Sequence, residues 1–370
     1  MARRTDRSRW TAALLAALLC LVPAAARADV VIAAVGSSEP PGNPAAAVRS
    51  GVQLAASQLL TAGPDGKPVR VVSADDQCDE AGAAAAARSL VAQGVNVVIG
   101  HVCSSGAIAA ARIYADARVI FISPGARGPK FTEERAGPGI FRLAGRSDRQ
   151  AADIAAAIMA RYPGKKAAII NDTSPQSRDL ADVVHRLLTS AGYPVVHRES
   201  YAPGEKELTE LVRRLKIAGS DVVFVPAQPN DLAIILAQMR AQQLDAHVVG
   251  SDMLAVPAVI PAADLAGEAL KVMLPWVPKP QGATAERVLP LLQLGREARA
   301  IALQSYAAVE VIAQALREAG SADPAKLTAA LATKEFDTAI GHIRFNERGD
   351  AKIPSYALHA WRNSAWQLAH

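Results

Sequence analysis

The sequence predicts an α/β protein with two Rossmann-like lobes, each built around a mostly parallel sheet. Short runs rich in β-branched residues alternate with longer stretches of helical periodicity, which is typical of βαβ units. This alternation occurs in two series, over about 30–143 and about 148–276. Ligands of such sheets bind beyond the carboxyl ends of the strands. Two series therefore indicate two lobes with a cleft between their strand ends.

The first series contains four expected strands with helices between them. A helix over about 45–61 follows the first strand, and a Gly-Pro-Asp-Gly turn at 63–66 follows that helix. Asp79 is the expected N-cap of an alanine-rich helix that runs to Gln93. The segment Ile140–Leu143 has the pattern of an extended crossing segment. The four strands are expected at 30–35, 69–74, 95–100 and 119–123.

The second series contains five expected strands and is followed by a mainly helical region. Its strands are expected at 167–171, 194–197, 221–226, 247–250 and 269–274. Its helices are expected at 148–161, 179–191, 205–218 and 232–243. A long helix over about 296–319 and a short one near 325–333 come next, before two late strands at 341–345 and 356–361.

The first 28 residues are expected to be a secretory signal peptide rather than part of the fold. Four arginines precede the apolar run Ala12–Val22, and Ala26-Arg27-Ala28 matches a cleavage site before Asp29. Without the five arginines and one aspartate of this leader, 35 basic and 34 acidic residues remain. This balance produces no basic surface field, so nucleic acid is not an expected partner.

Two loops of small residues follow neighbouring strands of the first series. Cys103–Gly106 comes just after the strand that ends at Gly100, and Ser123–Gly128 ends the next strand. Ser104 and Ser105 would also lie in the first turn of a helix, where unpaired N–H groups and the helix dipole attract an anion. These loops predict a corner that binds a carboxylate.

Cys78 and Cys103 are the only cysteines outside the leader. In an oxidising compartment an even number of cysteines indicates a disulfide. This bond would join the loop after one strand to the loop after the next, close to the expected ligand corner.

Other interpretations of these residues remain open at this stage. His101-x-Cys103-Ser104 could belong to a nucleophilic site, although its spacing matches no triad signature. The acidic run from Asp75 to Glu80 could bind a metal, but such carboxylates are more often caps and turn residues. Ser104 could simply cap a helix, and Asp252, after the strand 247–250, could be a plain turn residue.

Three motifs together resemble the periplasmic leucine/isoleucine/valine-binding proteins, which are solute receptors of ABC importers with the type I periplasmic-binding fold. These motifs are Asp75-Asp76-x-Cys78-Asp79, Val98-Ile99-Gly100-His101-x-Cys103-Ser104-Ser105 and Ser123-Pro124-Gly125-Ala126. The resemblance continues through Gly204-Glu205-Lys206 and Asp221-Val222-Val223 to the region 341–350. It covers nearly all of the chain after the leader.

The resemblance implies roles for particular residues. The serine after the second cysteine, Ser104, would accept the α-carboxylate of a ligand, helped by backbone N–H groups of Gly125, Ala126 and Arg127. Asp252 would hold the α-ammonium, at a position where the family usually has glutamate. These roles are physically reasonable, because each pole of a desolvated zwitterion needs a fixed partner.

The chain also departs from the family. Arg127 replaces a threonine, Gln176 and Gln228 replace two tyrosines, and Pro40, Pro41 and Pro44 occupy a loop where an aromatic residue is expected. The pocket should therefore be more polar than one for leucine. We expect a polar or acidic amino acid, or another small carboxylate, unless Arg127 points to solvent and contributes only its N–H group.

The sequence as a whole predicts an exported, monomeric solute receptor in the periplasm, without a cofactor, metal or enzymatic activity, that docks on a membrane permease. The resemblance implies three crossovers, near 142–147, 274–278 and 336–341. Lobe 1 would then comprise 29–143 and 277–338, and lobe 2 would comprise 144–276 and 339–370. A sensory receptor of the same fold and an exported enzyme are the alternatives.

Overall fold

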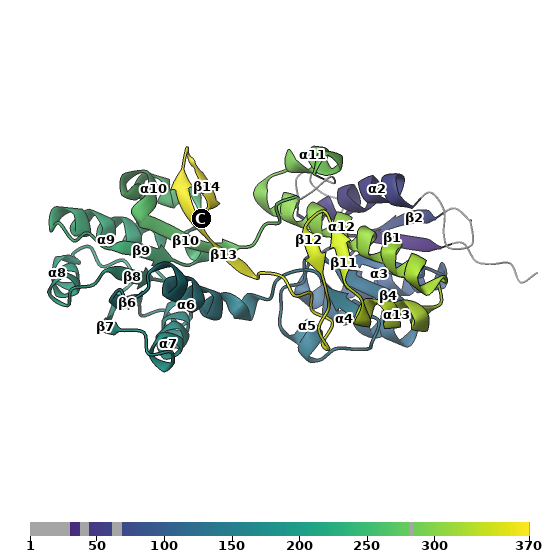
Figure 1. Ribbon diagram of the computed structural model, residues 1–370, viewed down its shortest axis with the longest axis horizontal. Coiled ribbons are helices and arrows are strands. Elements are labelled where there is room, and N and C mark those ends of the chain that lie inside the picture. Colours follow the sequence, from purple (N-terminus) through teal and green to yellow (C-terminus); the bar gives the residue numbers. More distant parts are fainter. Residues whose placement is uncertain (1–29, 38–43, 61–68, 281–284, 370) are drawn as a thin grey trace, which may run out of the picture.

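The computed structural model describes residues 30–37, 44–60, 69–280 and 285–369. The expected leader at 1–28 and the loop residues Pro40 and Pro41 lie outside this part of the chain. Two sheets organise the described residues, and Figure 1 shows them at opposite ends of the long axis, each with its own helices. The predicted α/β class with two mainly parallel sheets is confirmed.

The first sheet has five strands, all parallel. Their order is β2 (Arg70–Ala74), β1 (Val31–Val35), β3 (Val97–Gly100), β4 (Ile120–Ser123) and β5 (Ile140–Arg142). The helices of this half are α2 (Ala47–Leu59), α3 (Glu80–Ala92), α4 (Ser104–Asp116), α5 (Lys130–Glu133), α11 (Leu289–Leu292), α12 (Arg296–Ala319) and α13 (Pro324–Thr333). Residues 140–142, expected only as a crossing segment, therefore form a fifth strand of the sheet.

Alternate residues of β1 face two different cores. Ile32 and Ala34 pack with α2 and α12 on one face, and Val31, Ala33 and Val35 pack with α3 and α4 on the other. Burial on both faces explains why these strands are almost continuously apolar. The two helices α2 and α12 approach closely at Gly51, where an added Cβ atom would lie 2.2 Å from the carbonyl oxygen of Ala302.

The second sheet has seven strands. Their order is β14 (Ala365–Leu368), β13 (Tyr356–Arg362), β10 (Leu270–Pro275), β9 (His247–Gly250), β8 (Val222–Val225), β6 (Ala167–Asp172) and β7 (Val195–Tyr201). β13 runs antiparallel to both of its neighbours, and the other pairs are parallel. The helices of this half are α6 (Gln150–Arg161), α7 (Pro175–Ser190), α8 (Thr209–Ile217), α9 (Pro229–Ala241) and α10 (Ile260–Ala266).

The segment in which the third crossover was expected forms a hairpin. β11 (Phe336–Thr338) pairs with β12 (Gly341–Ile343), and Phe336, Ile343 and Phe345 pack in the core with α12. An expected lobe boundary between 338 and 339 would split this hairpin. We therefore propose that lobe 1 extends to about residue 353, and that the chain crosses to lobe 2 just before β13.

Two helices of the second half begin earlier than the periodicity predicted. α7 begins at Pro175, after Ser174 whose side chain accepts from the Ser177 N–H, and α9 begins at Pro229. Proline is favoured in the first turn because its missing N–H would have no partner there. As a result Gln176 lies in the first turn of α7 and Gln228 is the N-cap residue of α9.

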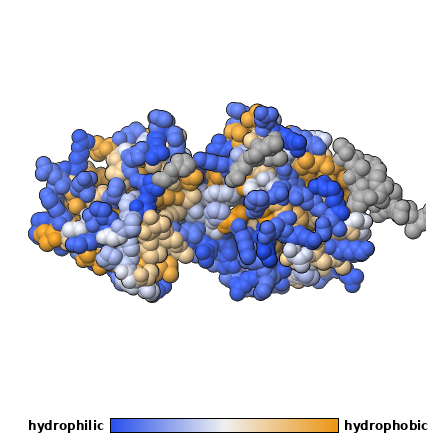
Figure 2. Space-filling model, viewed as in Figure 1, coloured by the Kyte–Doolittle hydropathy of each residue, from blue (hydrophilic) through white to orange (hydrophobic). Residues whose placement is uncertain are grey.

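The surface of both lobes is largely hydrophilic on the face drawn in Figure 2, with smaller hydrophobic areas between the polar ones. None of the helices in the described ranges is both long and apolar enough to cross a membrane.

Candidate ligand-binding site

Ser104 lies at the carboxyl edge of the first sheet, at the first residue of α4. Cys103 is the N-cap residue, so Ser104 does not have the capping role that was the alternative. Its hydroxyl oxygen accepts a hydrogen bond from the Gly128 N–H at 2.9 Å. Because a hydroxyl can accept and donate at once, its hydrogen remains suited to donate to a ligand carboxylate.

The turn after β4 is held mainly by Ser123. Its hydroxyl accepts from the N–H groups of Ala126 at 2.9 Å and Gly125 at 3.4 Å. Gly125 has little room for a side chain, since a Cβ atom there would lie 2.6 Å from Val102. Two of the three expected backbone donors of this turn are therefore engaged inside the lobe. The Arg127 N–H has no acceptor within the described ranges.

The side chain of Arg127 points across to the start of β13. Its Nη2 donates to the Ser355 carbonyl at 3.3 Å, and its guanidinium lies 4.7 Å from the centre of the Tyr356 ring. The Ser147 N–H donates to the Arg127 carbonyl at 2.9 Å. Arg127 thus joins the two lobes through both its side chain and its backbone, and its side chain does not simply extend into solvent.

Asp252 follows β9 at the carboxyl edge of the second sheet and is half-buried. Its Oδ1 accepts from the Gln150 side-chain amide at 2.7 Å. Burial raises the pKa of the nearby Tyr356 hydroxyl, Arg127 lowers it and Asp252 raises it further. Asp252 and Arg127 therefore lie close enough to Tyr356 for both of their charges to act on the same hydroxyl.

Gln176 and Gln228 lie at the N-terminal ends of the neighbouring helices α7 and α9 and are exposed. These two helix ends are adjacent because β6 pairs with β8 and because the Ser177 hydroxyl donates to the Pro226 carbonyl. Within the described residues, no hydrogen bond or ion pair connects either glutamine side chain to Arg127 or Asp252. The structure thus brings Arg127 and Asp252 toward one another, whereas the two glutamines form a separate polar edge of the second lobe.

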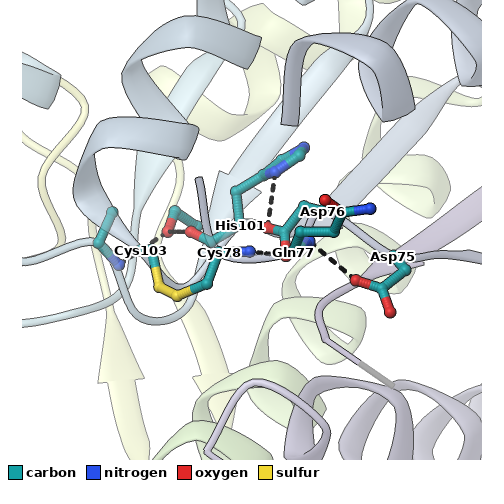
Figure 3. Close-up of a disulfide and its surroundings, with 8 residues drawn as sticks. Asp75, Asp76, Gln77, Cys78, His101 and Cys103 are labelled. Atoms are coloured by element: carbon teal, nitrogen blue, oxygen red, sulfur yellow. Dashed lines mark hydrogen bonds and ion pairs between the residues drawn. A yellow bond between two sulfur atoms is a disulfide. The ribbon is translucent and has the colours of Figure 1, made fainter. Parts of the chain in front are cut away.

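The two cysteines form the expected disulfide, with their Cα atoms 5.3 Å apart (Figure 3). Beside it, His101 Nδ1 lies 3.0 Å from Asp76 Oδ2, and His101 Nε2 lies 2.9 Å from the Tyr114 hydroxyl. Burial, and to a lesser extent Asp76, raise the pKa of Tyr114. All three side chains are buried, so this chain of hydrogen bonds belongs to the core of the first lobe.

These contacts also bear on the two chemical alternatives raised by the sequence, a nucleophilic site at Cys103 and a metal site in the acidic run from Asp75 to Glu80. Cys103 is bonded to Cys78 and has no free thiol with which to attack a substrate. Asp76 pairs with His101, and Asp79 caps α3 by accepting from the Gly82 N–H at 2.7 Å. No group of three metal-ligating side chains is found in the described ranges. The acidic run is thus explained by capping and by one buried hydrogen bond.

Removal of the disulfide by replacing both cysteines with serine should lower the free energy of unfolding by about 3 kcal/mol, because the unfolded chain loses a closed loop. Chemical denaturation of the oxidised protein and of the double variant measures this difference. Thiol titration of the denatured, unreduced protein should find no free thiol beyond the leader. Two free thiols per chain would show that the bond is absent from the exported protein.

The sequence did not identify three residues that contact this region: Gln150, Tyr356 and Arg142. Gln150 lies at the start of α6, shortly after β5, which the sequence did not predict as a strand, and Tyr356 lies at the start of β13. One signal was available for Tyr356. Because β13 is antiparallel to β10, its first residues lie at the same edge as the carboxyl end of β10, and Tyr356 pairs with Pro275.

Comparison with known proteins identifies relatives over almost the whole chain. The family model described as periplasmic binding protein matches residues 31–364. The chain is 32% identical over 325 residues to the Leu/Ile/Val-binding protein homolog 1 of Brucella abortus, covering 86% of each chain. It is 31% identical over 319 residues to the leucine-, isoleucine-, valine-, threonine-, and alanine-binding protein of Pseudomonas aeruginosa, covering 86% of this chain and 85% of that one.

A solved structure shows the same fold. It is the ABC transporter substrate-binding protein from Desulfitobacterium hafniense in complex with Leu, which matches with a TM-score of 0.63 at 21% identity. The match covers 93% of this chain and 100% of that one.

Proposed function

This chain belongs to the periplasmic binding protein family, and on that premise we propose that it captures an amino acid or a related small carboxylate between its lobes and delivers it to an ABC importer. The family binds solutes and does not catalyse reactions, so the chain is not an enzyme. The expected periplasmic location, a signal peptide removed after Ala28, a monomeric state and docking on a membrane permease are parts of the same proposal.

The observation that supports this function best is the placement of opposite charges around Tyr356. Arg127 reaches it from the first lobe and Asp252 lies near it in the second. A zwitterion bound between the lobes loses water at both poles, so each pole needs a partner held in place. Asp252 is suited to an ammonium group, and the Ser104 hydroxyl with the N-terminus of α4 is suited to a carboxylate.

The ligand class follows from the same residues and from the named relatives. One relative is named for leucine, isoleucine and valine, and another also for threonine and alanine. In this chain a guanidinium lies where the two lobes meet, and Gln176 and Gln228 edge the second lobe. Such groups favour a ligand with polar or acidic atoms over a purely aliphatic one, because unpaired polar groups are costly to desolvate.

A thermal-shift screen tests this function directly. The probes are the twenty amino acids together with benzoate and simple aliphatic carboxylates. A ligand at 100 times its Kd should add about 2.7 kcal/mol to the free energy of unfolding. Stabilisation by an amino acid or a carboxylate is the expected result. Stabilisation only by sugars or cations in a control panel would contradict the proposal.

Arg127→Ala should weaken binding of an acidic amino acid by roughly tenfold to a hundredfold, because it removes a charge-assisted hydrogen bond of about 1.5–3 kcal/mol. Binding of L-leucine by the same variant should change little. Calorimetric titration with L-glutamate and L-leucine measures both affinities, and Arg149→Ala, which removes an exposed arginine nearby, is the matched control. Tight leucine binding that survives Arg127→Ala, without glutamate binding by the wild type, would refute the polar specificity.

A further inference from the structure

Arg142 is a fully buried arginine at the end of β5. Its Nε and Nη2 reach Asp350 Oδ1 at 2.7 and 2.6 Å, and Nη2 also donates to the Thr132 hydroxyl. Its remaining nitrogen, Nη1, donates to the carbonyl oxygens of Gly128 at 2.7 Å and Ala126 at 3.3 Å. One guanidinium therefore connects the third crossover region to the turn that follows β4.

These contacts orient the backbone of the turn. The C=O and N–H of a trans peptide point in opposite directions. Because the Ala126 carbonyl points at Arg142 in the lobe interior, the Arg127 N–H of the same peptide points away from it. The Arg127 carbonyl accepts from the Ser147 N–H, but the carbonyl of Gly128, two residues after Ala126, again points at Arg142, and the Gly128 N–H donates to the Ser104 hydroxyl. Arg142 thus fixes both ends of the segment from Ala126 to Gly128.

We propose that Arg142 is a positioning residue of the ligand site, which holds the Ala126 and Gly128 carbonyls inside lobe 1 so that the Arg127 N–H faces the cleft next to the Ser104 hydroxyl. Asp350 and Thr132 fix the guanidinium itself, so the turn cannot rotate without breaking its two hydrogen bonds to a group that is held in place. This role rests on the proposed function, because it assumes that a carboxylate binds at this turn.

Two variants separate positioning from general stability. Arg142→Lys keeps a positive charge facing Asp350 but lacks the fork that reaches both carbonyls. Thr132→Val removes another hydrogen bond of the same guanidinium and leaves its contacts with Asp350 and both carbonyls in place. Both variants should lower the melting temperature. Arg142→Lys should weaken binding of L-leucine or L-glutamate, whichever the wild type binds more tightly, about tenfold or more, whereas Thr132→Val should stay within about threefold.

A second measurement does not depend on amino-acid binding or on the folding of the lysine variant. Acetate serves as a minimal carboxylate probe, and the amide signals of ¹⁵N-arginine-labelled wild type are followed by NMR. The Arg127 amide should move on titration with acetate. If it does so in a protein that binds neither an amino acid nor any other carboxylate of the screen tightly, the proposed function fails, while the carboxylate site on which the positioning role rests stands.

Three results would overturn the inference. The first is a folded Arg142→Lys variant with wild-type affinity. The second is a Thr132→Val variant that loses as much affinity as the lysine variant. The third is an Arg127 amide signal that does not respond to acetate in the wild type.

Discussion

Replacing Asp350 with alanine should lower the free energy of unfolding by about 3–5 kcal/mol, because it leaves the Arg142 guanidinium buried without its counter-charge. Arg142 is completely inaccessible, and Asp350 is its partner through both Nε and Nη2. Burial already lowers the pKa of Arg142, and Asp350 is the main group that opposes this effect. Chemical denaturation monitored by circular dichroism measures the difference between the variant and the wild type.

The matched control for Asp350 is Glu133→Ala. Glu133 pairs with Arg146 of the same charge network, but its side chain is 42% exposed. An exposed ion pair of this kind contributes at most about 1 kcal/mol. Equal effects of Asp350→Ala and Glu133→Ala would show that burial does not determine the strength of this network. A loss below about 1 kcal/mol for Asp350→Ala would show the same.

Replacing Asp252 with alanine should weaken ligand binding by about 2–5 kcal/mol, because closure of the lobes would leave a ligand ammonium without its partner. In the structure Asp252 is half-buried, and its Oδ1 is held by Gln150, which leaves Oδ2 without a hydrogen-bond partner in the described residues. A carboxylate fixed in this way loses little freedom when it binds a cation. Calorimetry with the amino acid that gives the largest thermal shift measures the change.

Asp245→Ala is the control for Asp252, since it removes an exposed carboxylate from the loop before β9. It should leave the affinity unchanged. The Asp252 variant should also keep its binding of benzoate if the wild type binds it, because benzoate has no ammonium group. Normal amino-acid binding by Asp252→Ala would show that this residue is only part of a turn.

Most of the strands and helices and the positions of the first-lobe loops could be predicted from the sequence, although β5, β11 and β14 were not. Val97–Gly100 and Ile120–Ser123 were recognisable because a strand buried on both faces is continuously apolar. Asp79 was recognisable as an N-cap, since the interaction that it makes is local, with the N–H three residues later. The disulfide followed from the number of cysteines. These features depend on residue type and on neighbours close in the chain.

The arrangement of the site depends on contacts between residues that are far apart in the sequence. Arg142 reaches Asp350 across 208 positions, Arg127 reaches Ser355 across 228, and Gln150 reaches Asp252 across 102. Hydrophobic periodicity reports which side of an element is buried, but not which distant residue it meets. The sequence pattern around 140–142 therefore does not show whether Arg142 is buried in a strand or lies at the exposed edge of a crossing segment. Arg142 can be buried because Asp350 supplies its counter-charge. Asp350 comes within reach of Arg142 only when the third crossover region packs against β5.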